Sequence, residues 1–195
     1  MKKNFTTAIL FTLVTTVMLG LVYPAVVTAL AQLFFRSEAN GQLISKNGEV
    51  IGSRIIAQPF TGAQYFHPRP SAAGTNGYDP TSSSGSNLGP TNQKLVDRIK
   101  ADVATLQAER PGQPVPVDLV TTSGSGLDPD LSPEGAQYQV ARVAKARAIG
   151  ETDLEKLVAA HVVPRQFGFL GESRVNVLEL NLELDQRFPA RQPAQ

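Results

Sequence analysis

The chain has 195 residues, of which 18 are basic and 17 acidic, so its formal net charge at pH 7 is +1. Only two basic residues precede position 36. The following 160 residues therefore contain 16 basic and 17 acidic side chains, which excludes the strongly basic surface of a nucleic-acid-binding protein. The chain contains no cysteine, which is compatible with either side of a membrane.

The first predicted element is a helix that crosses a membrane. Thirty-two consecutive residues, Asn4–Phe35, carry no charged side chain, and most of them are apolar. Because a bilayer core takes about 20 helical residues, residues 5–27 suffice to span it. Residues 29–35 then end at the far headgroup level, where Phe34 and Phe35 are suitable interfacial aromatics.

A cleaved signal peptide is the alternative to this anchor. Lys2 and Lys3 form a positive start, and Ala29-Leu30-Ala31 has the small-x-small form of a cleavage site. The apolar part of a signal peptide has about 7–15 residues, whereas Phe5–Tyr23 alone has 19. We therefore predict an uncleaved membrane anchor over residues 1–36.

The remaining residues, 37–195, are expected to form one extracytoplasmic domain. Arg36, Lys46 and Arg54 follow the apolar segment closely and weaken the charge contrast that usually marks the cytoplasmic end. A long domain crosses a membrane largely regardless of its charges. We therefore expect a single-pass protein with its N-terminus in the cytoplasm and its C-terminal domain outside.

Small and polar residues recur at every fourth position of the membrane segment, starting at Asn4. Residues four apart form a continuous row on a helix, and small side chains in such a row let another helix approach closely in lipid. We predict that this row, the membrane ridge, contacts a partner helix; it consists of Ala8, Thr12, Thr16, Gly20, Pro24 and Thr28. The alternative is a plain anchor whose threonine hydroxyls bond back to the carbonyl four residues earlier. Pro24 should also kink the helix, because it lacks a backbone donor.

Beyond the membrane, residues 42–56 favour a β-hairpin. Asn47-Gly48 separates β-prone runs that contain Leu43-Ile44 and Val50-Ile51, and Asn-Gly between such runs is the strongest short hairpin signal. Residues 60–92 are rich in Gly, Ser, Pro and Asn and should form a long loop without regular structure. A loop of this length inside a domain is usually either functional or disordered.

Regular structure should return with a helix that starts at Thr91 or Asn92 and continues through Arg110. Leu95, Ile99, Val103 and Leu106 form its apolar stripe at helical spacing. Prolines after Arg110 end the helix, and residues 115–122 then resemble a short β-prone run.

Two further helices and a strand complete the predicted domain. Ser132, Pro133 and Glu134 should begin one helix, which Gly150 ends. A capping box at Thr152-Asp153-Leu154-Glu155 should open the next helix, whose face contains Leu154, Leu157, Val158 and His161. In residues 174–185, leucines alternate with polar residues, as in a strand with one wet face. The predicted fold class is α+β, with about three helices and several short strands after the anchor.

Motifs for catalysis or metal binding are not evident. The Gly/Ser runs at residues 82–89 and 123–126 lack the lysine of a phosphate loop, and no Gly-x-Ser-x-Gly elbow occurs. The two histidines, His67 and His161, are far apart and have no cysteine or second histidine at ligand spacing, so no metal site and no catalytic residue is predicted. The residues alone indicate a membrane-anchored, non-enzymatic partner domain.

Five segments together resemble one family. They are residues 66–71 (Phe-His-Pro-Arg-Pro-Ser), 86–92 (Ser-Asn-Leu-Gly-Pro-Thr-Asn), 120–129 (Val-Thr-Thr-Ser-Gly-Ser-Gly-Leu-Asp-Pro), 132–136 (Ser-Pro-Glu-Gly-Ala) and 175–181 (Val-Asn-Val-Leu-Glu-Leu-Asn). In this order, behind a single N-terminal membrane segment, they closely resemble the C subunit of the bacterial Kdp potassium-transporting ATPase. The resemblance covers essentially the whole chain.

The resemblance implies an accessory role in a complex of the bacterial cytoplasmic (inner) membrane. The partners would be a channel-like potassium-selective subunit, a P-type ATPase subunit, a very small membrane peptide and the lipid bilayer. Assembly and transport would require this chain. ATP and potassium would be handled by the complex, and no cofactor is expected on this subunit itself. The chain lacks the Asp-Lys-Thr-Gly sequence that P-type pumps phosphorylate, so hydrolysis is expected in another chain.

The alternative function is a nucleotide-binding catalytic chaperone that raises the ATP affinity of the pump. Residues 131–137 faintly resemble the Leu-Ser-Gly-Gly-Gln signature of ABC transporters, with Ser132 and Gln137 as candidate nucleotide-binding residues. Pro133 and Glu134 stand where that signature has glycines, and a glutamate would repel a phosphate. We therefore favour a helix cap at Ser132, and a domain outside the cell would also be separated from ATP.

The loop that contains Ser86, Asn87, Leu88, Gly89, Pro90, Thr91 and Asn92 is predicted to be an ordered contact with the channel-like subunit. Pro90 fixes its own φ and biases Gly89 away from the α region. Asn87, Thr91 and Asn92 offer donors and acceptors, and Leu88 adds one apolar contact. The alternatives are an internal scaffold for the domain and a plain linker.

Overall fold

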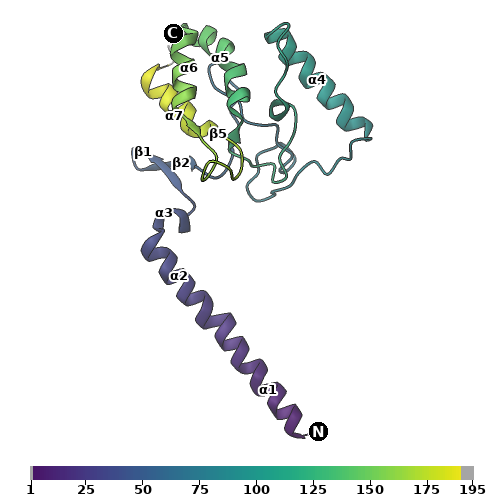
Figure 1. Ribbon diagram of the computed structural model, residues 1–195, viewed down its shortest axis with the longest axis vertical. Helices are drawn as coiled ribbons and strands as arrows, with labels where there is room; N and C mark the ends of the chain where they lie inside the picture. Colours follow the sequence, from purple (N-terminus) through teal and green to yellow (C-terminus); the bar gives the residue numbers. More distant parts are fainter. Residues whose placement is uncertain (1, 190–195) are drawn as a thin grey trace. The chain divides into compact units, whose positions relative to one another are not determined.

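The computed structural model describes residues 2–189, which divide into two compact units, one up to Ile51 and one from Gly52 (Figure 1). The first unit contains one long apolar helix, Lys2–Phe34, whose most apolar 18-residue window has a mean hydropathy of 2.1. It consists of α1 (Lys2–Val17), a π turn (Met18–Val22) and α2 (Tyr23–Phe34). By its length and composition this helix is able to cross a membrane, as predicted.

Pro24 explains the π turn. Proline has no N–H to donate to the carbonyl of Gly20, four residues earlier. The backbone before it forms a wider turn, in which the N–H of Tyr23 donates to the carbonyl of Met18, five residues back. The backbone on the N-terminal side of Pro24 thus forms a π turn, and the kink stays a prediction.

The predicted hairpin is confirmed. After α3 (Arg36–Ala39), strands β1 (Leu43–Lys46) and β2 (Glu49–Ser53) form a two-stranded sheet. Asn47 and Gly48 form the turn between them, with φ values of 54° and 85°. A two-residue hairpin turn needs positive φ at both central positions, and asparagine and glycine tolerate it best.

In the second unit, three helices pack against a small sheet and against each other. The helices are α5 (Pro133–Arg147), α6 (Glu151–Ala160) and α7 (Val177–Arg187), and the strands are β3 (Asp130–Leu131), β4 (Val162–Val163) and β5 (Arg174–Asn176). The sheet is antiparallel with the order β3-β5-β4. Val175 of the central strand lies opposite both Leu131 and Val162.

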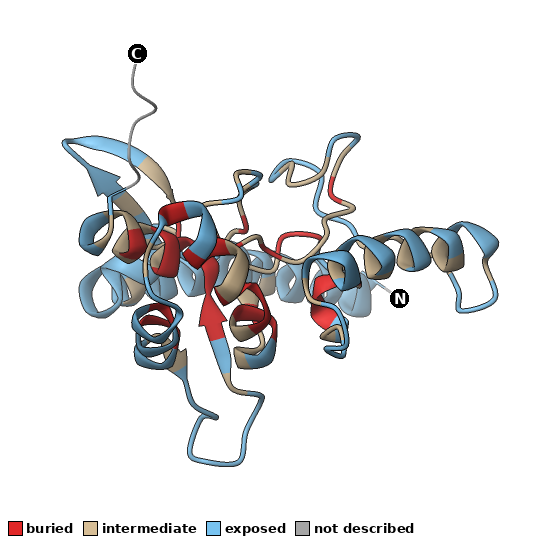
Figure 2. Ribbon diagram, turned by 90° about the horizontal axis from the view of Figure 1, so that it is seen from above, coloured by how far each residue is buried: buried red, intermediate tan, exposed pale blue. Residues whose placement is uncertain are grey.

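The hydrophobic core lies where α5, α6 and α7 meet β5 (Figure 2). The side chains of Val143, Leu154, Val175, Leu180 and Leu184 are fully buried there. Phe66, from the long loop before α4, is fully buried in the same core. Burial of each such side chain contributes roughly 1.5–3 kcal/mol, so this loop is part of the folded domain.

The helix α4 (Gln93–Glu109) contributes no fully buried residue. Asn92 is its N-cap and accepts a hydrogen bond from the N–H of Lys94 at 2.9 Å, so the predicted start is confirmed. The predicted apolar stripe is only half-buried. Near its C-terminal end, the carbonyl of Leu106 accepts a hydrogen bond from the hydroxyl of Tyr138 at 2.8 Å.

The strand predicted over residues 174–185 is wrong beyond its first residues. Only Arg174–Asn176 are extended, and Asn176 then caps α7 by accepting from the N–H of Glu179 at 3.1 Å. The alternating leucines also satisfy helical spacing: Leu180 and Leu184 are fully buried four residues apart, whereas Leu182 is not. Leucine and glutamate are strong helix formers. Residues 52–189 therefore contain four longer helices, α4–α7, where about three were expected.

Two smaller expectations are also wrong. Residues 115–122 contain a 3-10 helix, Val117–Leu119, because Pro114 and Pro116 lack the N–H donors that a strand needs. The helix α5 ends at Arg147, followed by its C-cap Ala148 with a left-handed φ of 54°, and Gly150 is instead the N-cap of α6. The helix α6 thus begins at Glu151, earlier than the capping box at residues 152–155 suggested, and Thr152 lies inside its first turn.

Candidate interaction surfaces

The membrane ridge is exposed along its whole length in this single chain. Threonines outside the ridge, at positions 6, 7 and 15, donate their hydroxyls to the carbonyl four residues earlier at 2.8–3.1 Å. Within residues 2–189, the hydroxyls of the ridge residues Thr12, Thr16 and Thr28 form no hydrogen bond. The ridge hydroxyls are therefore available to a partner, and the contact itself stays a prediction.

The π turn lies in the middle of the ridge. Gly20 is part of it, and a Cβ added to Gly20 would meet no atom within 4 Å. Residues four apart drift around a regular α-helix, and the larger number of residues in a π turn offsets this drift. Thr16, Gly20 and Pro24 therefore lie closer to one face than they would on a uniform α-helix.

In the second unit, two buried amides bind the backbone of the family motif at residues 66–71. Asn181 of α7 accepts from the N–H of Phe66 at 2.9 Å and donates to its carbonyl at 2.8 Å. Gln139 of α5 accepts from the N–H of His67 at 2.7 Å and donates to its carbonyl at 3.0 Å. Asn181 is only 1% exposed, and Gln139 is only 3% exposed. These side chains supply the pairing that a neighbouring strand would give.

Arg142 of α5 binds the residues just before this motif. Its guanidinium donates to the carbonyls of Ala63 and Tyr65 at 2.8 and 3.0 Å. It also pairs with Glu109 of α4 at 3.4 Å. Burial lowers the pKa of Arg142, and the carboxylate of Glu109 opposes that effect. Through these bonds, Arg142 joins α4, α5 and the loop.

Arg147 is the most deeply buried charge of this group, with a side chain that is 1% exposed. It donates to the carbonyls of Gln64 and Phe188 at 2.7 and 2.6 Å and to the carboxylate of Asp185 at 2.7 Å. Its guanidinium also lies 5.0 Å from the ring centre of Tyr65. Burial and the neighbouring Asp185 raise the pKa of Tyr65. One side chain thus connects the loop with α5 and α7.

The later part of the motif is fixed by Arg69, Ser71 and Tyr78. Arg69 pairs with Asp128 at 3.0 Å. The hydroxyl of Ser71 donates to the carbonyl of Gly126 at 2.6 Å and accepts from the N–H of Tyr78 at 2.7 Å. The hydroxyl of Tyr78 donates to the carbonyl of Arg69 at 2.8 Å, and burial raises its pKa to about 12. These bonds, within the loop and to residues 126 and 128, therefore fix the conformation of this part of the loop.

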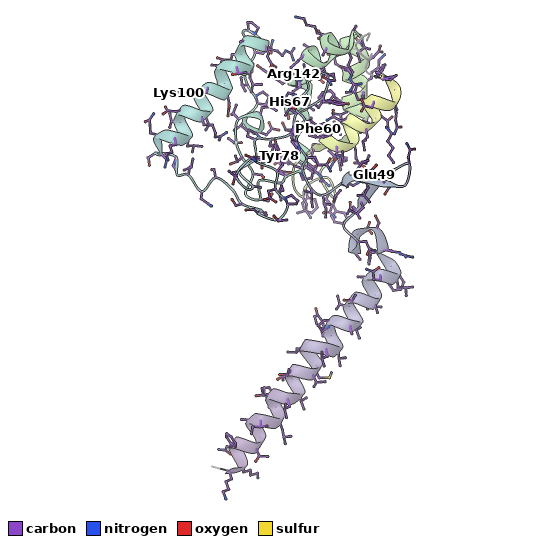
Figure 3. The ribbon with its side chains drawn as sticks, turned by 180° about the vertical axis from the view of Figure 1, so that it is seen from behind. Glu49, Phe60, His67, Tyr78, Lys100 and Arg142 are labelled. Atoms are coloured by element: carbon purple, nitrogen blue, oxygen red, sulfur yellow. The ribbon has the colours of Figure 1, made fainter. Side chains whose placement is uncertain are left out.

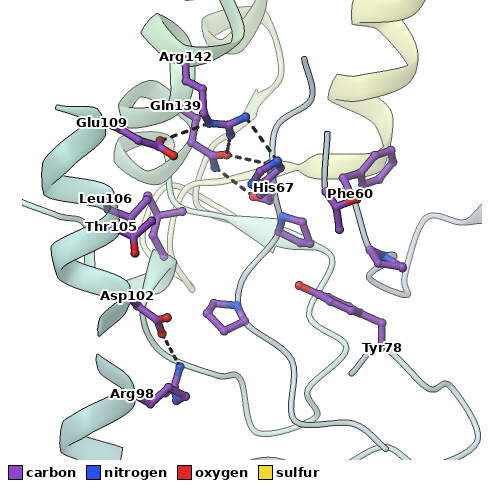
Figure 4. Close-up of a pocket in the computed structure, with 15 residues that line it drawn as sticks. Phe60, His67, Tyr78, Arg98, Asp102, Thr105, Leu106, Glu109, Gln139 and Arg142 are labelled. Atoms are coloured by element: carbon purple, nitrogen blue, oxygen red, sulfur yellow. Dashed lines mark hydrogen bonds and ion pairs between the residues drawn. The ribbon is translucent and has the colours of Figure 1, made fainter. Parts of the chain in front are cut away.

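A cleft of about 570 Å³ lies between this loop and α4 (Figure 4). Phe60, His67 and Tyr78 line it on one side, and Figure 3 shows these residues with Arg142 inside the second unit. Its charged groups form two pairs, Arg98–Asp102 at 3.0 Å and Arg142–Glu109 at 3.4 Å. Burial and the charge of Arg142 lower the pKa of His67. Among the described residues, no three His, Cys, Asp or Glu side chains are grouped to hold a metal.

Among the described residues, the predicted contact loop, residues 86–92, forms only local hydrogen bonds. The N–H of Leu88 donates to the hydroxyl of Ser86 at 3.5 Å, and the N–H of Asn92 donates to the carbonyl of Gly89 at 3.0 Å. Asn87 has a left-handed φ of 52° and is exposed. Within residues 2–189, its side chain forms no hydrogen bond. The loop thus presents an amide to solvent, and its partner contact stays a prediction.

The candidate nucleotide residues are occupied by hydrogen bonds within the domain, those of Ser132 at the start of α5 and that of Gln137 to α6. The hydroxyl of Ser132 accepts from the N–H of Gly135 at 2.9 Å, and the N–H of Ser132 donates to the buried carboxylate of Asp118 at 2.7 Å. Gln137 donates to Glu155 at 3.2 Å. The predicted cap is confirmed, and a carboxylate lies where a phosphate would have to approach.

Sequence reasoning missed the residues that fix the loop, namely Gln139, Arg142, Arg147 and Asn181. A signal was present for Gln139, because helical spacing places it on one face with the apolar residues Ala136 and Val143. A polar residue on a buried face needs a hydrogen-bond partner. Asn181 gave no such signal, because the strand pattern placed it on the wet face.

Comparisons with known proteins cover nearly the whole chain. The family described as "K+-transporting ATPase, c chain" matches residues 5–186. A potassium-transporting ATPase KdpC subunit of Koribacter versatilis is 64% identical over 193 residues, which cover 99% of this chain and 100% of that relative. The protein of the same name from Acidobacterium capsulatum is 56% identical over 94% of this chain and 98% of its own length. That of Methylobacterium nodulans is 55% identical over 88% and 90%.

Proposed function

Since the chain belongs to the KdpC family and is thus a subunit of the Kdp potassium-transporting ATPase complex, we propose that it is an accessory, non-catalytic subunit that stabilises the assembly of this complex. Its membrane ridge packs against a helix of the channel-like subunit, and its domain lies over the entrance of that subunit, where it shapes ion access. The loop at residues 86–92 supplies a second contact. The P-type ATPase subunit and the small membrane peptide complete the assembly.

The observation that carries this proposal is the difference between two sets of threonines in one helix. Those outside the ridge satisfy their hydroxyls on their own backbone, whereas Thr12, Thr16 and Thr28 leave theirs unused within the described residues. In lipid, polar side chains between helices are bound across the contact, and small residues allow close approach.

The proposed location places the N-terminus in the cytoplasm and the domain outside the bacterial inner membrane. Because the chain contains no cysteine, single cysteines can report on both sides. We expect a membrane-impermeant maleimide to label a Lys100→Cys variant in intact spheroplasts, and a Lys3→Cys variant only after permeabilisation. Labelling of position 100 only after permeabilisation would contradict this orientation. It would place the domain in the cytoplasm, where ATP could reach it, and so favour the nucleotide-binding alternative.

The nucleotide-binding alternative has less support. Glu134 and Gln137 line a pocket of about 480 Å³, but proline and aliphatic side chains form most of its walls. Its basic residue, Arg110, donates to the carbonyls of Gln137 and Tyr138 at 3.3 and 3.2 Å. A nucleotide site would need donors free to meet phosphate oxygens.

A further inference from the structure

The segment Arg165–Glu172, between β4 and β5, is a narrow hairpin with exposed apolar side chains at its tip. Phe167 is 79% exposed, Phe169 70% and Leu170 47%. The tip, residues 166–171, carries no charged side chain. Two exposed rings and a leucine within four residues form an apolar surface that is unusual outside interfaces.

The tip has a fixed geometry. Gln166 and Leu170 exchange two backbone hydrogen bonds of 2.9 Å, and the N–H groups of Phe169 and Gly168 donate to the carbonyls of Gln166 and Arg165. Phe167 and Gly168 have positive φ values of 54° and 82°. This conformation is uncommon for phenylalanine. The rings are thus presented by an ordered turn.

The same contacts suit a segment that leaves water for lipid. Four of the six N–H groups of the tip are already bonded within the hairpin, which lowers the cost of moving this backbone out of water. The nearest charges, Arg165 and Glu172, pair with each other at the base of the hairpin. Phenylalanine and leucine are among the side chains that enter the boundary between headgroups and acyl chains in membrane-surface segments.

The chain that carries this tip also carries the long apolar helix Lys2–Phe34, which is able to cross a membrane, so the second unit is tethered to a bilayer. We propose that the hairpin tip, residues 166–171, inserts Phe167 and Phe169 into the headgroup region of the membrane that holds the N-terminal helix. This inference rests on the proposed membrane anchorage and gives the domain a second membrane contact.

Tryptophan fluorescence tests this proposal directly, because the chain contains no tryptophan. Full-length Phe167→Trp and Phe169→Trp variants are reconstituted in phosphatidylethanolamine and phosphatidylglycerol vesicles. Lipids brominated near the headgroup end of their acyl chains should quench both tryptophans several times more strongly than aqueous iodide does. The matched control is Val117→Trp, at an apolar position of the same unit that is 70% exposed. Iodide should quench that tryptophan more strongly than the brominated lipids.

Equal quenching of positions 167, 169 and 117 by brominated lipid would overturn the proposal. Protection of position 167 from both quenchers in the assembled complex would also overturn it and indicate a protein pocket as the occupant. Flotation of each variant with the vesicles after a carbonate wash tests the anchorage separately. Loss of flotation would overturn the anchorage and with it this proposal, whereas flotation without lipid quenching would overturn the proposal alone.

Discussion

Asn181 and Phe66 lie 115 positions apart in the sequence and are joined by two backbone-directed hydrogen bonds of 2.9 and 2.8 Å. Asn181 is 1% exposed, and Phe66 is fully buried. The loop that carries the Phe-His-Pro-Arg-Pro-Ser motif is therefore fixed to α7. A segment without regular secondary structure becomes as ordered as the helices around it.

The first prediction concerns this pair. Replacing Asn181 with leucine keeps a similar volume but leaves the N–H and carbonyl of Phe66 unpaired in the core. We expect the free energy of unfolding of the full chain in detergent to fall by about 2–4 kcal/mol, measured by urea denaturation. Gln137→Ala, which removes an amide bonded to Glu155 at the surface, should change it by less than about 0.5 kcal/mol. An unchanged midpoint for the leucine variant would show that the loop does not depend on this amide.

The second prediction concerns pH. Burial and Arg142 lower the pKa of His67 in the folded protein below its ordinary value of 6.5. The folded state then binds fewer protons than the unfolded state, so stability is lost as the pH falls from 6.5 through the lowered pKa. In a His67→Gln variant this loss should be smaller in urea denaturation series over the same pH range. Parallel pH profiles for both proteins would contradict the assignment.

The buried amides of Gln139 and Asn181 also show what the sequence could and could not predict. The hairpin turn, the cap of α4 at Asn92 and the start of α5 at Ser132 were predictable, because each depends on a few neighbouring residues with specific backbone preferences. The order of the long loop was not, because its partners lie on α5 and α7. The helix α7 was missed because its leucines fit both a period of two and a helical face, and only packing against α6 and β5 separates the two.

The third prediction concerns the loop at residues 86–92. Because Asn87 has a positive φ, glycine removes its side chain without strain. Asn87→Gly combined with Leu88→Ala should weaken recovery of the complex by affinity purification, while the midpoint of urea denaturation of the chain itself stays unchanged. Asn87→Gly alone is the control, because it keeps Leu88 and so separates the effect of the asparagine from that of the leucine. An equal loss of stability would favour an internal scaffold, and no effect in either assay would leave a plain linker.

The fourth prediction concerns the start of α5. Glu134→Ala with Gln137→Ala should leave the apparent ATP affinity of the assembled complex unchanged, measured from the ATP dependence of its hydrolysis. Glu134 should contribute only a few tenths to about 1 kcal/mol of helix stability through the helix dipole. A changed ATP affinity with intact assembly and location would favour the nucleotide-binding alternative over the cap.

The proposed assembly role depends most directly on the membrane ridge. Leucine at both Thr16 and Gly20 raises hydrophobicity, so the chain should still insert, but the larger side chains block close approach of a partner helix. The matched control is Thr7→Leu with Thr15→Leu, at two positions outside the ridge whose hydroxyls bond to their own backbone. The deciding measurement is the amount of the channel-like and P-type ATPase subunits that co-purify with each tagged variant in detergent. We predict a strong loss for Thr16→Leu with Gly20→Leu and full recovery for the control, whereas full recovery for both would show that the ridge is not the interface.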